Sequence, residues 1–415
     1  MLRRRLALTG AFLCVFFAAQ AQSASEYNAT GVGHYNAGEW DKAVEAFLKA
    51  YELAPDNTTV RANLCNAYQA AAHELAKAAD FTSATKLLEQ AIGVSPDNSS
   101  PLIQLASYYL RLDLVSDAIF RLEEATDLDP ENVTAHDLLG DAYYKANDLP
   151  TALAEWEWVK SVEPNRAGLR EKLEKAQREE SVERDFVKTK SRHFEASFAP
   201  GTNRRDLSNV LYILEQAYID VGRKLGYAYP TTPIQVIVYT AEGFSDATLL
   251  AEHVGAVYDG KIRIPLQDTT GQTIGEEELR RRLTHEYVHV VLRFLANGNA
   301  PWWLNEGLAE TFSRPSINAD MKTMLAKARD ENRLFRLANL EGPQLQQLSV
   351  DELRLAYCQA YAMVQHLWDR FGSRVLCGFL ASLAEGTPAA EAFSDHYKRT
   401  YDMFEKEIAY TIPGG

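Results

Sequence analysis

The sequence contains little cysteine, which excludes a fold held together mainly by disulfide bonds. Its 415 residues include four cysteines, and one of them, Cys14, lies in an apolar N-terminal segment. The other three are Cys65, Cys358 and Cys377, an odd number that allows at most one disulfide within the chain. We therefore expect each of them to be a small buried residue and not a metal ligand.

An excess of basic residues is also missing. Acidic residues outnumber basic ones by 57 to 43, and the sequence pI is about 5.2. A broad basic surface for nucleic acid would have to form against this balance, so no nucleic-acid partner is expected. A chain of 415 residues is too long for one ordinary domain, and two or three units are expected.

Long apolar runs are absent after the N-terminus. The run from Leu6 to Ala19 follows three arginines and precedes small residues that end at Ala24. It is shorter than the roughly 20 apolar residues that a membrane-spanning helix needs. The pattern predicts a signal peptide over residues 1–24, an exported protein that is periplasmic or secreted, and no transmembrane segment after signal cleavage. A membrane anchor formed by an uncleaved signal is the alternative.

Prolines divide the next segment at a regular interval. Pro55, Pro96, Pro130 and Pro164 are separated by 41, 34 and 34 residues. A 34-residue period is typical of the tetratricopeptide repeat, a helix-turn-helix unit that stacks on its neighbours. Residues 25–166 are therefore predicted to form about four repeats in an all-α solenoid. The second repeat is seven residues longer, and we expect both of its helices to be lengthened around residues 70–79.

Within each repeat, small and aromatic residues recur where the two helices should meet. In the last repeat these residues include Gly140, Tyr143, Ala152 and Trp156. The segment resembles tetratricopeptide-repeat proteins, whose arrays usually present a concave groove to a peptide or protein partner. A protein partner in this groove is one expectation, and a rigid spacer is the alternative.

The second half of the chain changes character. Residues 167–191 are densely charged and predict a solvated linking helix without a functional site. Beyond it, residues 192–415 predict a separate α+β domain with strands first and helices after, so the whole chain is expected to be multidomain. Strand patterns lie at residues 193–198, 234–239 and 261–265, and helical patterns lie at residues 209–225 and from residue 276 onward.

Two histidines in the helical segment 276–295 form a candidate metal site. His285 and His289 are four residues apart, so both imidazoles project from one helix face and can bind a single cation. Glu286 lies beside them and can accept a proton from a zinc-activated water as general base. The arrangement predicts one Zn²⁺ ion as cofactor.

A third ligand is needed, because catalytic zinc sites usually hold three protein ligands and leave one position for water. Glu306 follows His289 by 17 residues, which leaves room for a turn and a returning helix. We predict Glu306 as this ligand. Glu310 lies one turn further on the same face, and we predict that its carboxylate orients a metal-binding histidine.

The two halves of this pattern together resemble the gluzincin metallopeptidases. They are His-Glu-x-x-His at residues 285–289 and Trp-Leu-Asn-Glu-Gly-Leu-Ala at residues 303–309. With tetratricopeptide repeats in front, residues 192–415 are similar to the peptidase MA-like family. This resemblance implies a zinc metallopeptidase that hydrolyses polypeptides. It also implies a tyrosine that stabilises the oxyanion; we predict Tyr357, with Tyr361 as the alternative and a core aromatic role open for either.

The sequence lacks the Gly-x-Met-Glu-Asn element by which the aminopeptidase branch grips a free amine. We therefore expect an endopeptidase and not an aminopeptidase. An edge strand that runs past the metal can bind an extended peptide by strand addition. The segment predicted for this role consists of Lys261, Ile262, Arg263 and Ile264.

A different class of function is an envelope scaffold whose metal site is weak or inactive and whose repeats mediate protein–protein interaction. A disused site would be expected to lose at least one of its ligands or its base. His285, Glu286, His289 and Glu306 are all present. Their presence favours an enzyme whose repeats recruit a protein substrate or partner.

Overall fold

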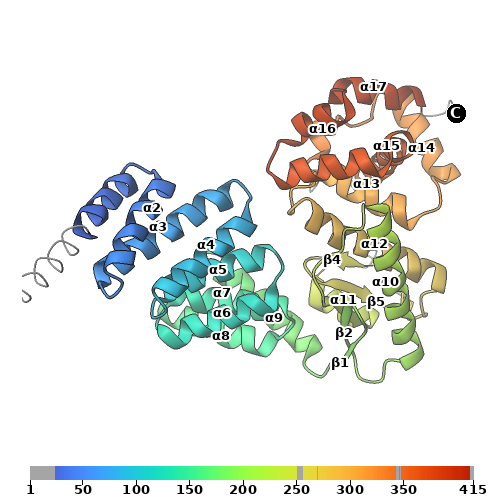
Figure 1. The fold of residues 1–415 in the computed structure, drawn as a ribbon. Helices are drawn as coiled ribbons and strands as arrows, with labels where there is room; N and C mark the ends of the chain where they lie inside the picture. The colour runs from blue at the N-terminus through green and yellow to red at the C-terminus, as the bar shows by residue number, and fades with distance from the viewer. Residues whose placement is uncertain (1–23, 250–255, 269, 343–344, 346, 412–415) are drawn as a thin grey trace, which may run out of the picture. The chain divides into compact units, whose positions relative to one another are not determined.

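The computed structural model describes residues 24–249, 256–268, 270–342, 345 and 347–411 (Figure 1). The signal peptide predicted for residues 1–24 lies outside these residues, apart from Ala24. The chain divides into two compact units, residues 1–144 with 151–167 and residues 145–150 with 168–415. Among the helices of the described ranges, none is long and apolar enough to cross a membrane.

The first unit is a series of helical hairpins, as the proline period predicts (Figure 1). Small residues let the two helices of a hairpin approach each other: a side chain at Gly31 would collide with the Phe47 ring, and one at Gly140 with the Trp156 ring. After a helical stretch over residues 24–36, the helices are α2 (Trp40–Leu53), α3 (Thr58–Lys77), α4 (Phe81–Val94), α5 (Ser99–Arg111), α6 (Val115–Leu128), α7 (Val133–Lys145) and α8 (Leu149–Val162).

The extra length of the second repeat lies entirely in α3. This helix has 20 residues, whereas the first helices of the next two repeats, α5 and α7, have 13. The second helix, α4, is 14 residues long, the same length as α2, α6 and α8. Our expectation that both helices lengthen is therefore wrong. The start of α4 is fixed by Asp80, whose side chain accepts a hydrogen bond from the Ser83 backbone N–H.

The second unit begins with a five-stranded sheet in the order β1-β2-β3-β5-β4 (Figure 1). Strands β2, β3 and β5 are parallel, and the short strands β1 and β4 pair antiparallel at the two edges. The three central strands match the strand patterns in the sequence, whereas the two edges were not predicted. The strands are β1 (Val187–Lys190), β2 (Phe194–Phe198), β3 (Ile234–Tyr239), β4 (Val257–Tyr258) and β5 (Ile262–Pro265).

Helices follow and cover the sheet. Helix α10 crosses from β2 to β3 and packs on α12, which carries the two histidines. Helix α13 packs against both α12 and α15, and Gly307 permits this because a side chain there would collide with Ala360 and Val364 of α15. The helices are α9 (Leu169–Glu183), α10 (Arg204–Lys224), α11 (Ala241–Thr248), α12 (Glu276–Leu295), α13 (Trp302–Ser313), α14 (Ala319–Asp330), η1 (Leu337–Leu340), α15 (Val350–Ala384), α16 (Ala389–Tyr397) and α17 (Tyr401–Thr411).

The charged segment predicted as a solvated helix is partly buried. Helix α9 buries one face that includes the carboxylates of Glu179 and Glu183, which are 1% and 7% exposed. Both carboxylates pair with the Arg263 guanidinium of β5, at N···O distances of 2.8 and 3.1 Å. Burial lowers the pKa of the nearby Lys261 ammonium to about 8. The segment thus supplies the counter-charges of the sheet, and β1 also lies within it.

The same contacts contradict the prediction that Lys261, Ile262, Arg263 and Ile264 bind substrate. Strand β5 pairs with β3 on one side and with β4 on the other, so it is not an edge strand. Lys261 and Arg263 are 2% and 1% exposed, and Ile262 and Ile264 lie in the hydrophobic core. The strand that borders α12 at the edge of the sheet is β4.

Replacing Arg263 with Met should lower the free energy of unfolding by about 3–5 kcal/mol, because Glu179 and Glu183 would remain buried without the guanidinium that pairs with both of them. Urea unfolding of the wild type and the variant measures this difference. Arg223→Met is the matched control, since the Arg223 side chain is 62% exposed and its loss should change the free energy by about 0.5 kcal/mol or less. Equal effects of the two substitutions would contradict the role assigned to Arg263.

The cysteines agree with the expectation of small buried residues. Cys65 and Cys358 are buried, and Cys377 is half-buried. All three are free thiols in the structure. Burial raises the pKa of each thiol, which keeps the groups protonated and inert at neutral pH.

Candidate active site

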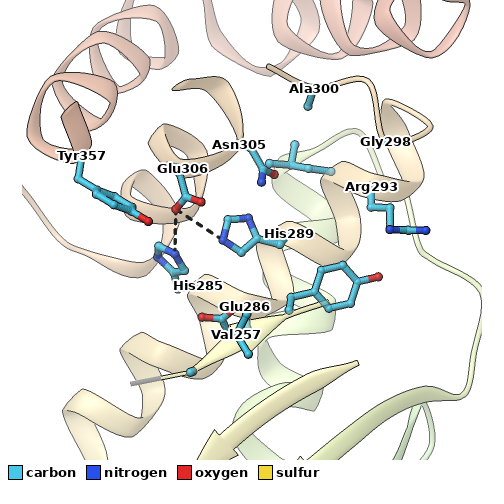
Figure 2. A pocket seen from close by; sticks show the side chains of 13 residues that line it. Val257, His285, Glu286, His289, Arg293, Gly298, Ala300, Asn305, Glu306 and Tyr357 are labelled. Carbon is cyan, nitrogen blue, oxygen red and sulfur yellow. Dashed lines mark ion pairs between the residues drawn. The ribbon is translucent and has the colours of Figure 1, made fainter. Parts of the chain in front are cut away.

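The structure brings His285, His289 and Glu306 together at one point. The Nε2 atoms of His285 and His289 lie 3.4 and 3.7 Å from the same carboxylate oxygen of Glu306 (Figure 2). The two imidazole rings are almost perpendicular, with centroids 4.8 Å apart. Helix α12 supplies both histidines and α13 supplies the glutamate. The four-residue interval is one turn of α12, and the packing of α13 on α12 closes the 17-residue interval.

This geometry suits a zinc ion. Ligand atoms at about 2.0–2.2 Å from a tetrahedral ion are roughly 3.3–3.6 Å apart, close to the two nitrogen–oxygen distances seen here. One ligand atom from each of the three residues lies within 4.8 Å of the others. Two imidazole nitrogens and one carboxylate oxygen are also the donor set of several catalytic zinc sites. The donor set and the two nitrogen–oxygen distances therefore fit a metal ion held by these three side chains.

Glu310 lies on the Nδ1 side of the His285 imidazole, away from Glu306. Its Oε1 atom is 3.5 Å from Nδ1 of His285, too long for a hydrogen bond but on the side from which a carboxylate would orient the ring. The other oxygen of Glu310 accepts a hydrogen bond from the Arg314 Nε–H, which fixes the carboxylate in place. Glu310 is thus where the sequence pattern predicts an orienting group.

Glu286 projects from α12 beside the histidines, below them in Figure 2 and next to Val257 of β4. Its carboxyl is buried, and burial raises its pKa to about 7. The positive charges of His285 and Arg281 and the backbone N–H of Tyr258 oppose this rise. The carboxyl can therefore both accept and release a proton near neutral pH, as a general base and acid must.

Tyr357 of α15 points its hydroxyl toward the three ligands (Figure 2). Its ring packs edge-on against Trp302 at a centroid distance of 5.0 Å. Burial raises its pKa, so the phenol stays protonated and can donate a hydrogen bond. Tyr361, the alternative from the sequence, is fully buried and does not line the cavity over His285, His289 and Glu306. The geometry favours Tyr357.

A cavity of about 470 Å³ opens over the three candidate metal ligands, His285, His289 and Glu306 (Figure 2). Eight of the residues on its wall were not among the site residues predicted from the sequence. Asn305 precedes the metal-binding glutamate and could have been suspected from that position, whereas Val257 and Tyr258 form a strand of two residues, too short for a periodic pattern. The cavity is lined by Ala256, Val257, Tyr258, His285, Glu286, His289, Leu292, Arg293, Gly298, Ala300, Asn305, Glu306 and Tyr357.

Comparison with known families supports the two-part architecture. Residues 214–410 match the Peptidase MA superfamily. Residues 24–57 and 103–157 match the tetratricopeptide repeat. Both the predicted family resemblance and the predicted fold class, a tetratricopeptide-repeat solenoid followed by an α+β domain, are confirmed.

Individual proteins are also similar to parts of this chain. The tetratricopeptide repeat domain-containing protein PYG7 of Arabidopsis thaliana chloroplasts is 38% identical over 89 residues, which are 20% of this chain and 30% of that protein. The chain therefore spans less than a third of the length of this curated relative. The solved structure of MamA is 20% identical, with a TM-score of 0.31 and coverage of 37% of this chain and 81% of that one. For Pseudomonas aeruginosa pilF the values are 19%, 0.30, 39% and 71%.

Proposed function

We propose, from the Peptidase MA superfamily domain at residues 214–410, that the protein is a zinc-dependent endopeptidase. The observation that carries this proposal is the convergence of His285, His289 and Glu306 around one point, with Glu286 and Tyr357 facing the same cavity. Three ligands, a buried carboxyl and a phenol donor are the parts that hydrolysis of a peptide bond by a metal-activated water requires.

A zinc ion held by His285, His289 and Glu306 would polarise the substrate carbonyl and lower the pKa of a bound water. Glu286 accepts the proton of the attacking water and delivers it to the leaving amine. Tyr357 donates a hydrogen bond to the oxyanion that develops on the substrate carbonyl. Glu310 keeps the imidazole of the first ligand in its binding orientation.

Strand β4 is the proposed binding site for the substrate backbone. It is the edge of the sheet, and its residues Val257 and Tyr258 line the cavity beside Glu286. An extended peptide can add to such an edge through main-chain hydrogen bonds. A second cavity shares Ala256, His285 and Glu286 with the first, so space extends on more than one side of the metal-binding residues. This supports cleavage inside a polypeptide.

The repeats and the N-terminal pattern complete the proposal. Tetratricopeptide repeats mediate protein–protein interaction, and we propose that they recruit a protein substrate or a regulatory partner. The signal-peptide pattern of residues 1–24 supports export and action in the periplasm or outside the cell.

Metal analysis combined with proteolysis tests this function. The purified full-length protein should contain about one zinc per chain and should degrade unfolded casein. A chelator such as 1,10-phenanthroline should abolish the cleavage, and added zinc should restore it. A protein that binds no zinc, or cleavage that survives complete metal removal, would contradict the proposal and favour a scaffold.

The substitution Tyr357→Phe should lower kcat about 10²-fold or more, because it removes the hydrogen bond to the oxyanion and little else. Steady-state kinetics with a quenched fluorescent peptide measures the change. Tyr361→Phe is the matched control on the same helix, and it should leave kcat nearly unchanged. Wild-type turnover in Tyr357→Phe, with an intact zinc content, would exclude Tyr357 from the reaction.

A further inference from the structure

A second cavity adjoins the metal-binding residues and is rich in arginine. Its volume is about 640 Å³, and its wall comes mainly from α12, α13, α14 and α15. It shares His285, Glu286 and Tyr357 with the cavity described above, so it begins beside the proposed general base and oxyanion donor. Four arginines contribute to its lining, namely Arg281, Arg282, Arg314 and Arg354. Such a group of guanidinium ions is unexpected in a protein with a net charge of −14.

Two of these arginines share a single carboxylate. Arg281 binds both oxygens of Glu278 at 2.7 Å, and Nε of Arg282 lies 2.7 Å from one of them. The two guanidinium groups lower the pKa of Glu278 to about 2. The Glu278 carboxylate is thus shared between two guanidinium groups on this side of the cavity.

Arg354 is the arginine best placed to meet a ligand. It lies on α15 three residues before Tyr357, about 4.5 Å along the helix axis from the proposed oxyanion donor. Its side chain is exposed, and within the described part of the chain it has no ion pair. Arg314, by contrast, already donates its Nε–H to Glu310. Arg354 therefore has its donors available for a bidentate contact.

The remainder of the wall is mostly apolar. Besides Glu286 and Glu310 near the metal-binding residues, one carboxylate, the exposed Asp320, is among the described lining residues. The apolar part of the wall is formed by Met321, Met324, Val350 and Leu353. Such a surface can contact the methylene groups of a side chain whose carboxylate reaches the guanidinium groups.

On the premise of the peptidase function proposed above, we propose that this arginine-lined cavity is a substrate subsite for a carboxylate. Arg354 is its specificity-determining residue. A substrate bound beside Glu286 places its next one or two residues in this cavity, because each extended residue spans about 3.3–3.6 Å. The carboxylate can come from an Asp or Glu side chain next to the scissile bond, or from the C-terminus of a short peptide. Both sources offer the same planar pair of oxygens to a guanidinium.

Matched peptides test this subsite. Fluorescein-labelled alanine heptapeptides carry one Glu or one Gln, scanned through the positions, each with a free or an amidated C-terminus. Their binding to the Glu286→Gln protein is followed by fluorescence anisotropy, and their cleavage by the wild type is followed by chromatography. A carboxylate should improve binding at least about tenfold at one position. The preference is the ratio of the affinities for the peptides with and without the carboxylate. Arg354→Gln should reduce this ratio to about one, Arg354→Lys should keep part of the preference, and Arg223→Gln should keep all of it.

The outcomes separate the subsite from the peptidase function. Preference for Glu in amidated peptides identifies an acidic side chain, and preference only for a free C-terminus identifies a terminal carboxylate. Binding that is selective for the carboxylate without hydrolysis by the wild type would overturn the peptidase function and leave the subsite standing. Equal binding of Glu and Gln peptides with either C-terminus, no binding of any peptide, or a preference that survives Arg354→Gln would overturn the subsite.

Discussion

Replacing Glu286 with Gln is expected to lower kcat/KM for an unfolded protein substrate by about 10³-fold or more, with one zinc still bound. Gln keeps the shape of the side chain but can no longer accept the proton of the attacking water. The position supports this role, because Glu286 is buried beside His285 and His289 and lines the same cavity as Val257 and Tyr258 of β4. Kinetics with a quenched fluorescent peptide and zinc analysis of the same sample measure both quantities.

The control for this substitution is Glu278→Gln on the same helix. Glu278 pairs with Arg281 and Arg282 and is not among the residues that line either of the two cavities at Glu286. Its loss should reduce turnover far less than the loss of Glu286. Equal turnover of the wild type and Glu286→Gln would show that another group accepts the proton, or that the cleavage belongs to a contaminant.

Replacing Glu306 with Ala is expected to weaken zinc binding more than about 100-fold, beyond the 10–100-fold that is typical of an outer carboxylate. The reason is that Glu306 supplies the oxygen toward which both Nε2 atoms point, at 3.4 and 3.7 Å. Competition with a zinc-selective fluorescent chelator measures the dissociation constants of the wild type and the variant.

Glu310→Gln serves as the graded comparison for Glu306→Ala. Its carboxylate faces Nδ1 of His285, on the side of the ring away from the other two ligands. Its loss should weaken zinc binding about 10–100-fold. If Glu306→Ala weakens binding less than Glu310→Gln does, Glu306 is not a direct ligand and the assignment of the two carboxylates must be exchanged.

The candidate metal site could be predicted from sequence because its constraints are local. His285 and His289 are one helical turn apart, and Glu306 stands on the next helix after a short turn. The repeats were predictable for a similar reason, since the proline period and the small residues report contacts within one hairpin. In both cases the residues that meet are close in sequence.

Contacts between segments that are distant in sequence explain the predictions that were wrong. Lys261 and Arg263 were predicted to lie on a substrate-binding edge strand because Arg263 has one partner nearby in sequence, Asp259, whereas Glu183, which also pairs with it, is 80 residues away. The charged helix α9 was predicted to be solvated for the same reason, because Arg263, the partner of its buried carboxylates, is distant in sequence. Strand β4 was missed because it has two residues, and it becomes an edge strand only when β5 pairs with both neighbours.

The wrong prediction for the second repeat, that both of its helices lengthen, has a different cause. Seven residues correspond to about two helical turns, and periodicity alone cannot say which helix of a hairpin receives them. The cap at Asp80 decides this, because its bond to Ser83 starts α4 at a fixed residue and leaves the extra turns to α3. A side-chain cap thus carries information that the hydrophobic period does not.

X-ray diffraction from crystals of the zinc-loaded full-length protein, measured at the zinc absorption edge, tests the central claim most directly. We predict one anomalous peak about 2.0–2.2 Å from Nε2 of His285, Nε2 of His289 and a carboxylate oxygen of Glu306. Glu286 should lie beside this peak without binding it directly. Absence of a peak at these three residues in zinc-saturated crystals, or a peak on other ligands, would contradict the account.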